Sequence, residues 1–327
     1  MPVKLYSVRK YERKYFDIWN AFIATAKNAT FLFHRDFMEY HSDRFRDCSM
    51  IIYENENPVA LLPAHVEGNV VYSHNGLTYG GLVYGEKVKL AEIISIFSSV
   101  LKYLNSEGVM RMAIKTIPSI YHLKPAEEFH YALFLADAVL TRRDALSVID
   151  LSKPYTVTKT RRESIRRGIK NELVIKEEPE FRLFWEKILI PNLAKKHGVK
   201  PVHSLEEIEK LHRSFPENIR HFNVYHQEQI VAGTTVFVSE NVAHPQYISG
   251  REDKNTLGSL DFLYHHLLTE VFTQKRFFDF GISNEQQGRK LNEGLVFWKE
   301  SLGANTVVQD FYEVDTINFA SLEKVLI

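Results

Sequence analysis

The sequence predicts a mixed α/β protein made of two similar halves, and three observations point to this fold class. Helical and strand-like segments alternate along the chain, and one order of elements occurs twice. Corresponding segments keep a nearly constant spacing, so that Gly76 corresponds to Gly250. The length of 327 residues suits about two domains at roughly 150 residues each. We expect domains at 1–150 and 151–327, with a linker near Pro154.

Six elements are predicted in the first half. In chain order they are a helix, a hairpin of two strands, a short strand, a glycine-rich loop, a helix and a strand, at 12–27, 49–53 with 58–65, 69–72, 75–81, 89–105 and 109–115. Gly108 ends the second helix. The glycine-rich loop contains Tyr79 but no basic residue. We therefore expect it to shape a substrate pocket rather than bind phosphate, although a tight glycine turn is an equal alternative.

The second half repeats this order of elements. Two helices, a hairpin, a strand, a helix and a strand are predicted at 181–196, 204–213, 221–225 with 229–238, 242–249, 259–274 and 276–280. Ser204 and Glu207 have the spacing of a capping box, in which each side chain binds the other residue's backbone N–H. The repetition indicates a tandem duplication of one α/β unit.

Composition and charge narrow the class of protein. Lys and Arg together number 41, as do Asp and Glu, and this zero net charge excludes a globally basic nucleic-acid coat and an acidic tail. The single cysteine excludes an internal disulfide and a paired-cysteine zinc or redox site. No run approaches the ~18 apolar residues of a membrane span, and no secretory signal pattern occurs. We therefore expect a cytoplasmic protein that has no integral membrane segment and does not bind DNA.

The segment 159–170 is strongly basic, because it holds six Lys or Arg residues against one Glu. Arg162, Arg166 and Lys170 recur every four residues and share one helix face, while Ile165 and Ile169 are expected to pack on the opposite side. Guanidinium groups suit phosphate oxygens, so this face is a candidate for binding phosphates of a substrate. A solvated face paired with neighbouring glutamates is the alternative.

A polar connection from Tyr247 to Ser259 joins a predicted strand to a predicted helix. Arg251 and Lys254 lie within it, and Gly258 precedes Ser259 at the start of the helix. The first N–H groups of a helix can bind a phosphate, so this connection is a candidate phosphate-binding loop. A plain polar connection that ends in glycine is the alternative.

The order of elements resembles that of the GNAT acyltransferase unit, in which a central strand splays from its neighbour. The stretch 277–304 narrows the resemblance, because a strand ending in Asp279-Phe280-Gly281 is followed by Gly-Leu-x-x-Trp-Lys-x-x-Leu-Gly from Gly294. This pattern resembles the C-terminal signature of the FemABX-like, tandem GNAT acyltransferases. These include peptidoglycan-bridge aminoacyltransferases and acetyltransferases of polysaccharide synthesis. The basic segment 162–170 is similar to a stretch at the start of their second unit.

The resemblance implies an acyltransferase whose second unit binds the donor. Lys299 matches the family's lysine that steadies negative charge during acyl transfer, and Asp279 is a candidate proton acceptor or a structural cap. Donor phosphates are expected at Arg251, Lys254, Gly258 and Ser259, and substrate contacts at Arg162, Arg166, Lys170, Tyr79, Tyr247 and Trp298.

The donor implied by the resemblance is acyl-CoA or aminoacyl-tRNA, and no metal is expected. The acceptor is an amine or hydroxyl of a cell-envelope sugar or a nucleotide-linked precursor. Two alternatives remain open: a tRNA-dependent aminoacyltransferase, and a non-catalytic module that binds a nucleotide or an anionic glycan.

Overall fold

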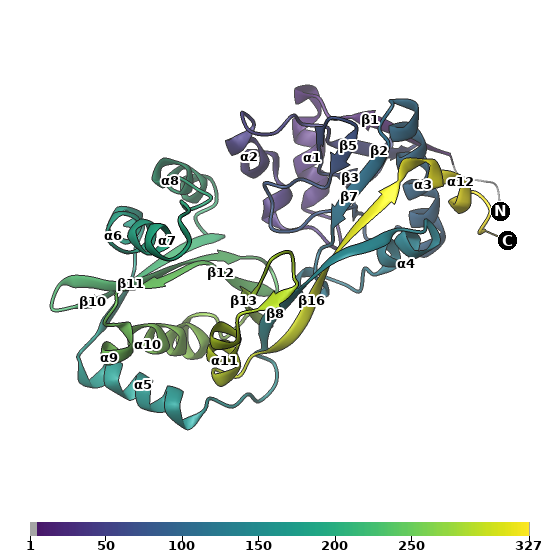
Figure 1. The fold of residues 1–327 in the computed structure, drawn as a ribbon. Helices are drawn as coiled ribbons and strands as arrows, with labels where there is room; N and C mark the ends of the chain where they lie inside the picture. The colour runs from purple at the N-terminus through teal and green to yellow at the C-terminus, as the bar shows by residue number, and fades with distance from the viewer. Residues whose placement is uncertain (1–4, 327) are drawn as a thin grey trace. The chain divides into compact units, whose positions relative to one another are not determined.

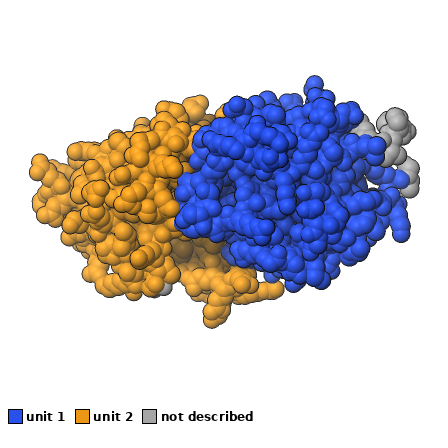
Figure 2. All heavy atoms as spheres, turned by 90° about the horizontal axis from the view of Figure 1, so that it is seen from above, with its two compact units in different colours: residues 1–144, 308–327 blue, residues 145–307 orange. Residues whose placement is uncertain are grey.

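The computed structural model describes residues 5–326, which divide into two compact units. Figure 1 shows the ribbon and Figure 2 colours the units. Unit 1 contains the chain up to Asp144 and the C-terminal segment from Val308, and unit 2 contains Ala145–Val307. Each unit has its own hydrophobic core. The sequence-based division differs from these units at the C-terminus, where the last long strand returns to unit 1 and pairs with a strand there.

Unit 1 contains two sheets, with strand orders β1-β2-β3-β6 and β4-β5-β7-β16. The strands are β1 (Tyr6–Lys10), β2 (Met50–Glu54), β3 (Asn57–Leu62), β4 (His65–Glu67), β5 (Val70–Tyr72), β6 (Val83–Tyr84), β7 (Arg111–Lys115) and the returning β16 (Asn305–Asp315), which belongs to unit 1 from Val308 on. The helices are α1 (Phe16–Ile23), α2 (Arg35–Met38), α3 (Leu90–Ser106), α4 (Glu128–Leu135) and α12 (Phe319–Leu322). The longest helix, α3, lies where the sequence predicts it, because its apolar residues recur at helical spacing and are buried in the core.

The glycine-rich loop of unit 1 differs from the loop that its place in the repeat suggests. It leads into the short strand β6, and α3 begins only after a further turn at Gly85. Gly80 is required for the close approach of this loop to Ser73, the residue after β5, because a Cβ there would lie 2.1 Å from the backbone oxygen of Ser73. The loop is therefore a packed connection between strands.

Unit 2 contains a mixed sheet of order β8-β13-β12-β11-β10-β9 and a small two-stranded sheet. The strands are β8 (Val139–Asp150), which belongs to unit 2 from Ala145 on, β9 (Val174–Glu177), β10 (Ile219–His226), β11 (Gln229–Val238), β12 (Val242–Gly250), β13 (Phe277–Ile282), β14 (Asn284–Glu285) and β15 (Lys290–Leu291). The helices are α5 (Lys159–Lys170), α6 (Phe181–Phe184), α7 (Ile190–His197), α8 (Leu205–Ser214), α9 (Lys254–Leu257), α10 (Ser259–His266) and α11 (Glu293–Ser301). In Figure 1, α5, α9 and α10 lie on one side of this sheet and α6, α7 and α8 on the other.

Several local predictions for unit 2 are confirmed. Ser204 and Glu207 form the capping box, with backbone-to-side-chain hydrogen bonds of 3.2 and 2.8 Å. Gln227 and Glu228 both have positive φ, as a two-residue hairpin turn with the twist of its strands requires. The predicted helix 259–274 is α10 extended by a π-helical turn at Leu267–Val271.

Helix α5 lies directly against α10, and the packing explains its sequence. Gly168 is at the contact, because a Cβ there would lie 2.5 Å from the Cβ of Phe262. Ile165 is buried, as predicted, but Ile169 is 61 % exposed, so the prediction that Ile169 packs inward is wrong. The small residues Ser164 and Gly168 complete the buried stripe instead, which lets the two helices approach closely. Within residues 5–326, no helix combines the length and apolar character that a membrane crossing requires.

Candidate active site

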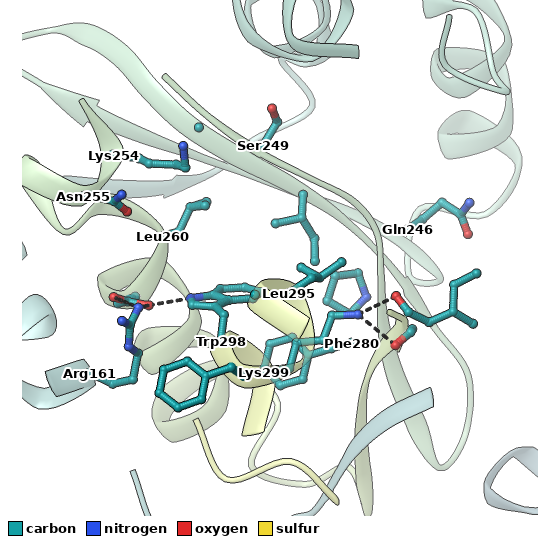
Figure 3. A pocket seen from close by; sticks show the side chains of 18 of the residues that line it. Arg161, Gln246, Ser249, Lys254, Asn255, Leu260, Phe280, Leu295, Trp298 and Lys299 are labelled. Atoms are coloured by element: carbon teal, nitrogen blue, oxygen red, sulfur yellow. Dashed lines mark hydrogen bonds and ion pairs between the residues drawn. The ribbon is translucent and has the colours of Figure 1, made fainter. Parts of the chain in front are cut away.

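A cavity of about 650 Å³ lies within unit 2 (Figure 3). Its walls come from β12 and the turn after it, from β13, and from helices α5, α10 and α11. Half of the side chains that line it are apolar or aromatic, and Lys299, Lys254 and Arg161 supply positive charge. The volume and this lining suit a small-molecule ligand with an anionic part.

The cavity exists because two parallel neighbours in the sheet diverge. β12 and β13 pair at only two positions near their N-terminal ends, Val242 with Phe277 and Ala243 with Phe278. Beyond these pairs the ladder stops, while both strands continue along the cavity. The divergence places a hydrophobic cleft between the two strands, which is the splayed arrangement expected from the sequence.

Each of the two diverging strands carries a bulge beside the cavity. Along β12, the ladder to β11 shifts so that Gln246 has no residue opposite it, and its Oε1 is buried without a hydrogen-bond partner. Along β13, the ladder to β8 shifts between Asp279 and Ile282. An extra residue bends a strand and leaves backbone groups outside the ladder. The bulge in β13 therefore presents carbonyl groups that a side chain can bind.

Lys299 extends from α11 to the bulged end of β13, as Figure 3 shows. Its ammonium group donates to the carbonyl oxygens of Gly281 at 2.9 Å and Ile282 at 2.7 Å, and the residue is only 2 % exposed. Gly281 has a φ of +71°, a backbone conformation that favours glycine. Because an ammonium carries three N–H groups, the two carbonyls leave one for a ligand in the cavity.

Burial of Lys299 lowers its pKa and strengthens the interaction of its positive charge with a nearby negative charge. Burial lowers the pKa of Lys299 from 10.5 to about 8, and the negative charge of Asp279 acts in the opposite direction. At pH 7 about 90 % of the side chains with such a pKa carry the proton. A cation shielded from water interacts more strongly with a nearby negative charge than an exposed one does.

Asp279 lies behind the cavity wall. It is 1 % exposed, and its Oδ1 accepts a hydrogen bond from the backbone N–H of Gly281 at 2.8 Å. Its Oδ2 lies 3.4 Å from Nδ1 of His244, and the same Nδ1 donates to the backbone oxygen of Asp279 at 2.8 Å. His244 is part of the cavity wall, whereas Asp279 is not. The structure thus places an imidazole on the wall in direct contact with the predicted carboxylate.

A second polar group on the wall joins three elements. Asp261, at the start of α10, accepts a hydrogen bond from Nε1 of Trp298 at 2.8 Å. It also forms an ion pair with Arg161 of α5, at an N···O distance of 3.0 Å. Asp261 is almost fully buried, so these two donors satisfy a charge that would otherwise be costly. The network fixes the indole of Trp298 against the cavity.

The residues predicted to hold donor phosphates occupy different places. Lys254 lines the cavity. Arg251 lies in a separate hollow of about 400 Å³. Gly258 and Ser259 mark the start of α10, as predicted, but they are covered by α5. A Cβ on Gly258 would lie 2.1 Å from the backbone oxygen of Ser164, and Ser259 is 0 % exposed. Of the four, only Lys254 is in the cavity wall.

The basic helix α5 and the helix α11, which carries Trp298 and Lys299, contribute to the cavity wall in a different way from the prediction. Trp298 lines the cavity together with Lys299. Arg162, Arg166 and Lys170 form an exposed face of α5 outside the cavity wall, and the arginine that reaches the cavity is Arg161. A role for the exposed face in binding phosphate stays a prediction.

Neither of the two predicted tyrosines is among the residues that line the cavity. The side chain of Tyr247 is on the opposite face of β12, where its hydroxyl oxygen accepts a hydrogen bond from the backbone N–H of His203 at 3.1 Å. Tyr79 belongs to unit 1, where its hydroxyl donates to Oγ1 of Thr30 at 3.0 Å. Both hydroxyl groups are held by buried contacts of their own unit.

The sequence analysis did not assign a role in the site to Arg161, His244, Gln246 or Asp261, which also line the cavity. Arg161 is next to the predicted face of Arg162, Arg166 and Lys170 on α5. Which of these side chains reaches the cavity depends on which side of α5 packs against α10. His244 and Gln246 lie on a strand without a motif, so only the splay of β12 reveals them. Among the side chains that the structure describes, no group of three or more His, Cys, Asp or Glu could hold a metal ion.

Comparison with known proteins agrees with this geometry. Residues 156–289 match the family model described as an acetyltransferase (GNAT) domain, and this segment contains both diverging strands. The crystal structure of FemX is similar over 93 % of this chain and 96 % of that chain, with a TM-score of 0.64 and 9 % identity. The chain has the FemABX-like, tandem GNAT fold. The mixed α/β fold class predicted from the order of elements is thus confirmed.

Two further solved structures share the FemABX-like, tandem GNAT fold. A conserved protein of unknown function from Bacteroides thetaiotaomicron covers 95 % of this chain and 99 % of its own, with a TM-score of 0.58 and 12 % identity. The C-terminal domain of a putative lysylphosphatidylglycerol synthetase from Agrobacterium fabrum covers 78 % and 80 %, with a TM-score of 0.54 and 12 % identity. A search of curated protein sequences finds no match. At these identities the likeness concerns the fold alone, and the part matched as a GNAT domain ends before Lys299.

Proposed function

We propose that unit 2 binds an acyl-CoA in the cleft between β12 and β13 and transfers its acyl group to an amine or a hydroxyl. The single observation that carries this proposal is the desolvated ammonium of Lys299, held at the wall of the cleft that opens in a GNAT domain. Such a group suits a reaction in which negative charge develops on an acyl oxygen.

The charges of the cavity favour an uncharged acyl group over an aminoacyl group. Asp261 is the one carboxylate among the wall residues of the described chain, and Arg161 and Trp298 already bind it. The ammonium of an aminoacyl donor would therefore meet Lys254 and Lys299 without a carboxylate to balance it. An anionic carrier such as CoA is instead attracted by the same lysines.

The reaction requires no covalent enzyme intermediate. Attack by the acceptor on the thioester carbonyl creates an oxyanion, and the remaining N–H of Lys299 can donate to it. Holding both substrates in one cleft replaces a bimolecular encounter by a positioned one. Removal of one oxyanion donor in such a site lowers kcat by about 10²- to 10³-fold.

The acceptor that we propose is a cell-envelope sugar or a nucleotide-linked precursor. Its support is the resemblance of 277–304 to acyltransferases of peptidoglycan bridges and polysaccharide synthesis, together with the FemABX-like fold.

Release of free thiol from acetyl-CoA tests the proposal, with amino sugars and UDP-sugars as acceptors and hydroxylamine as a small general acceptor. We expect release that depends on the acceptor and resists RNase. Lys299→Met should lower kcat by about 10²- to 10³-fold. Lys275→Met is the matched control, because Lys275 also donates to two backbone carbonyls, those of Ser239 and Glu240, but lies outside the cavity.

The outcomes separate the alternatives. Activity that requires a charged tRNA and is lost with RNase identifies an aminoacyltransferase. Binding of CoA or UDP-sugars without turnover of any acyl donor identifies a binding module. Equal activity of Lys299→Met and Lys275→Met would remove Lys299 from the mechanism.

A further inference from the structure

We propose that His244 is the general base of this acyl transfer and that Asp279 is a positioning residue that fixes the imidazole ring. The assignment rests on the function proposed above and identifies the group that takes the acceptor's proton. It replaces direct proton acceptance by Asp279 with acceptance by the histidine in front of it.

The hydrogen bonds of His244 define its tautomer. Nδ1 donates to the backbone oxygen of Asp279 at 2.8 Å, and a carbonyl oxygen can only accept. The carboxylate Oδ2 of Asp279 lies 3.4 Å from the same nitrogen, which further favours a proton there. In the neutral ring, Nε2 therefore carries the lone pair and is the atom that can accept a proton.

The location of His244 gives that lone pair access to a substrate. The residue lies on β12, it lines the cavity, and its side chain is 13 % exposed. Asp279 has no such access, because it is 1 % exposed and its Oδ1 is bound to the N–H of Gly281. The carboxylate can orient the ring and stabilise its protonated form, as in other carboxylate–histidine pairs, but it does not reach the acceptor.

One short segment of β13 holds both the base and the cation. His244 is bound to the backbone oxygen of Asp279, and Lys299 is bound to those of Gly281 and Ile282. The ring also packs against Gly281, because a Cβ there would lie 3.1 Å from Cε1 of His244. The bulge in β13 thus sets the separation between the group that takes a proton and the group that stabilises an oxyanion.

The proposed step balances as follows. The lone pair of the acceptor nitrogen or oxygen forms a bond to the thioester carbon, and the π electrons move to the carbonyl oxygen beside Lys299. Nε2 of His244 takes the proton from the attacking atom. The intermediate then collapses, the carbon–sulfur bond breaks, and the CoA sulfur leaves and receives the proton from His244. The products are the acylated acceptor and CoA with a free thiol.

Kinetics of two variants test the role of His244. We expect His244→Ala and His244→Gln to lower kcat for cleavage of acetyl-CoA by hydroxylamine by about 10²- to 10⁴-fold, with little change in KM for acetyl-CoA. The Gln variant keeps a donor for the oxygen of Asp279 but has no basic nitrogen. Added imidazole should restore part of the activity of His244→Ala, which a purely structural role would not allow. His226→Ala is the matched control, because His226 is the last residue of β10 and is not among the residues that line the cavity.

The tautomer provides a readout that does not depend on activity. The ¹⁵N shifts of the His244 ring, assigned by their loss in His244→Gln, should show that the neutral ring carries its proton on Nδ1 and none on Nε2. Asp279→Asn should weaken that preference and lower kcat more than it changes KM.

Four outcomes overturn the proposal. A neutral ring with its proton on Nε2 contradicts the tautomer that the hydrogen bonds define. A wild-type kcat in His244→Ala contradicts the role of His244 as the base. So does a loss of kcat in a folded His244→Ala that imidazole does not restore, and in both cases the proposed function stands. If the wild-type protein does not cleave acetyl-CoA with any acceptor, the proposed function fails and this role fails with it.

Discussion

Raising the pH from 7 to 9 should switch off the contribution of Lys299 to acyl transfer. The ammonium can stabilise an oxyanion only while it carries its proton, and burial lowers the pKa of Lys299 to about 8. The protonated fraction therefore falls from about 90 % at pH 7 to about 10 % at pH 9. The part of the rate that depends on Lys299 should fall about tenfold over this range. An ordinary lysine, with a pKa near 10.5, would lose almost nothing.

The assay is thiol release from acetyl-CoA with hydroxylamine as acceptor, because hydroxylamine stays neutral across this range and its own ionisation does not distort the profile. The uncatalysed rate is subtracted at each pH. Lys275→Met should show the same tenfold fall as the wild type, whereas the residual activity of Lys299→Met should not fall. A wild-type rate that is level between pH 7 and 9, or an equal fall in Lys299→Met, would refute the reasoning.

Three further predictions concern stability, measured by urea unfolding. Between pH 8 and 10.5 the unfolded chain keeps the proton of Lys299 that the folded chain releases. The free energy of unfolding of the wild type should therefore rise relative to that of Lys299→Met, by up to about 3 kcal/mol. A constant difference between the two proteins over this pH range would count against burial of the charge. Gly258→Ala should destabilise the protein by more than about 2 kcal/mol, because the new Cβ meets the backbone oxygen of Ser164 and φ is +75°; wild-type stability would mean that α5 and α10 are further apart. Trp298→Phe should cost about 1–3 kcal/mol, because Asp261 loses a buried donor, and an unchanged midpoint would contradict that hydrogen bond.

Much of the fold could be predicted from the sequence, because local sequence patterns indicate most of the helices and strands. Apolar spacing located α3, and the capping box located the start of α8. The two hairpins followed from polar turns between alternating runs. The return of β16 to unit 1 could not be read in this way, since it depends on pairing with β7, about 200 residues earlier in the chain.

The sequence motif that carries the resemblance includes Trp298 and Lys299, and both residues line the cavity. Their roles in substrate binding and catalysis stay predictions. His244 could not be found, because a histidine on a strand has many ordinary explanations and only the divergence of β12 from β13 opens its face to a ligand. The four-residue spacing predicts a role for Arg162 and not for Arg161, because spacing shows which residues share a helix face but not which face meets the cavity.

The central claim is that the acyl group of a donor lies in the cleft of unit 2 beside Lys299. A crystal structure with acetonyl-CoA, whose ketone cannot be transferred, tests it most directly. The account predicts the ketone oxygen within about 3.2 Å of Nζ of Lys299, between β12 and β13. An analogue bound elsewhere, for example in the cavity of about 940 Å³ in unit 1, with the cleft of unit 2 empty, would contradict it.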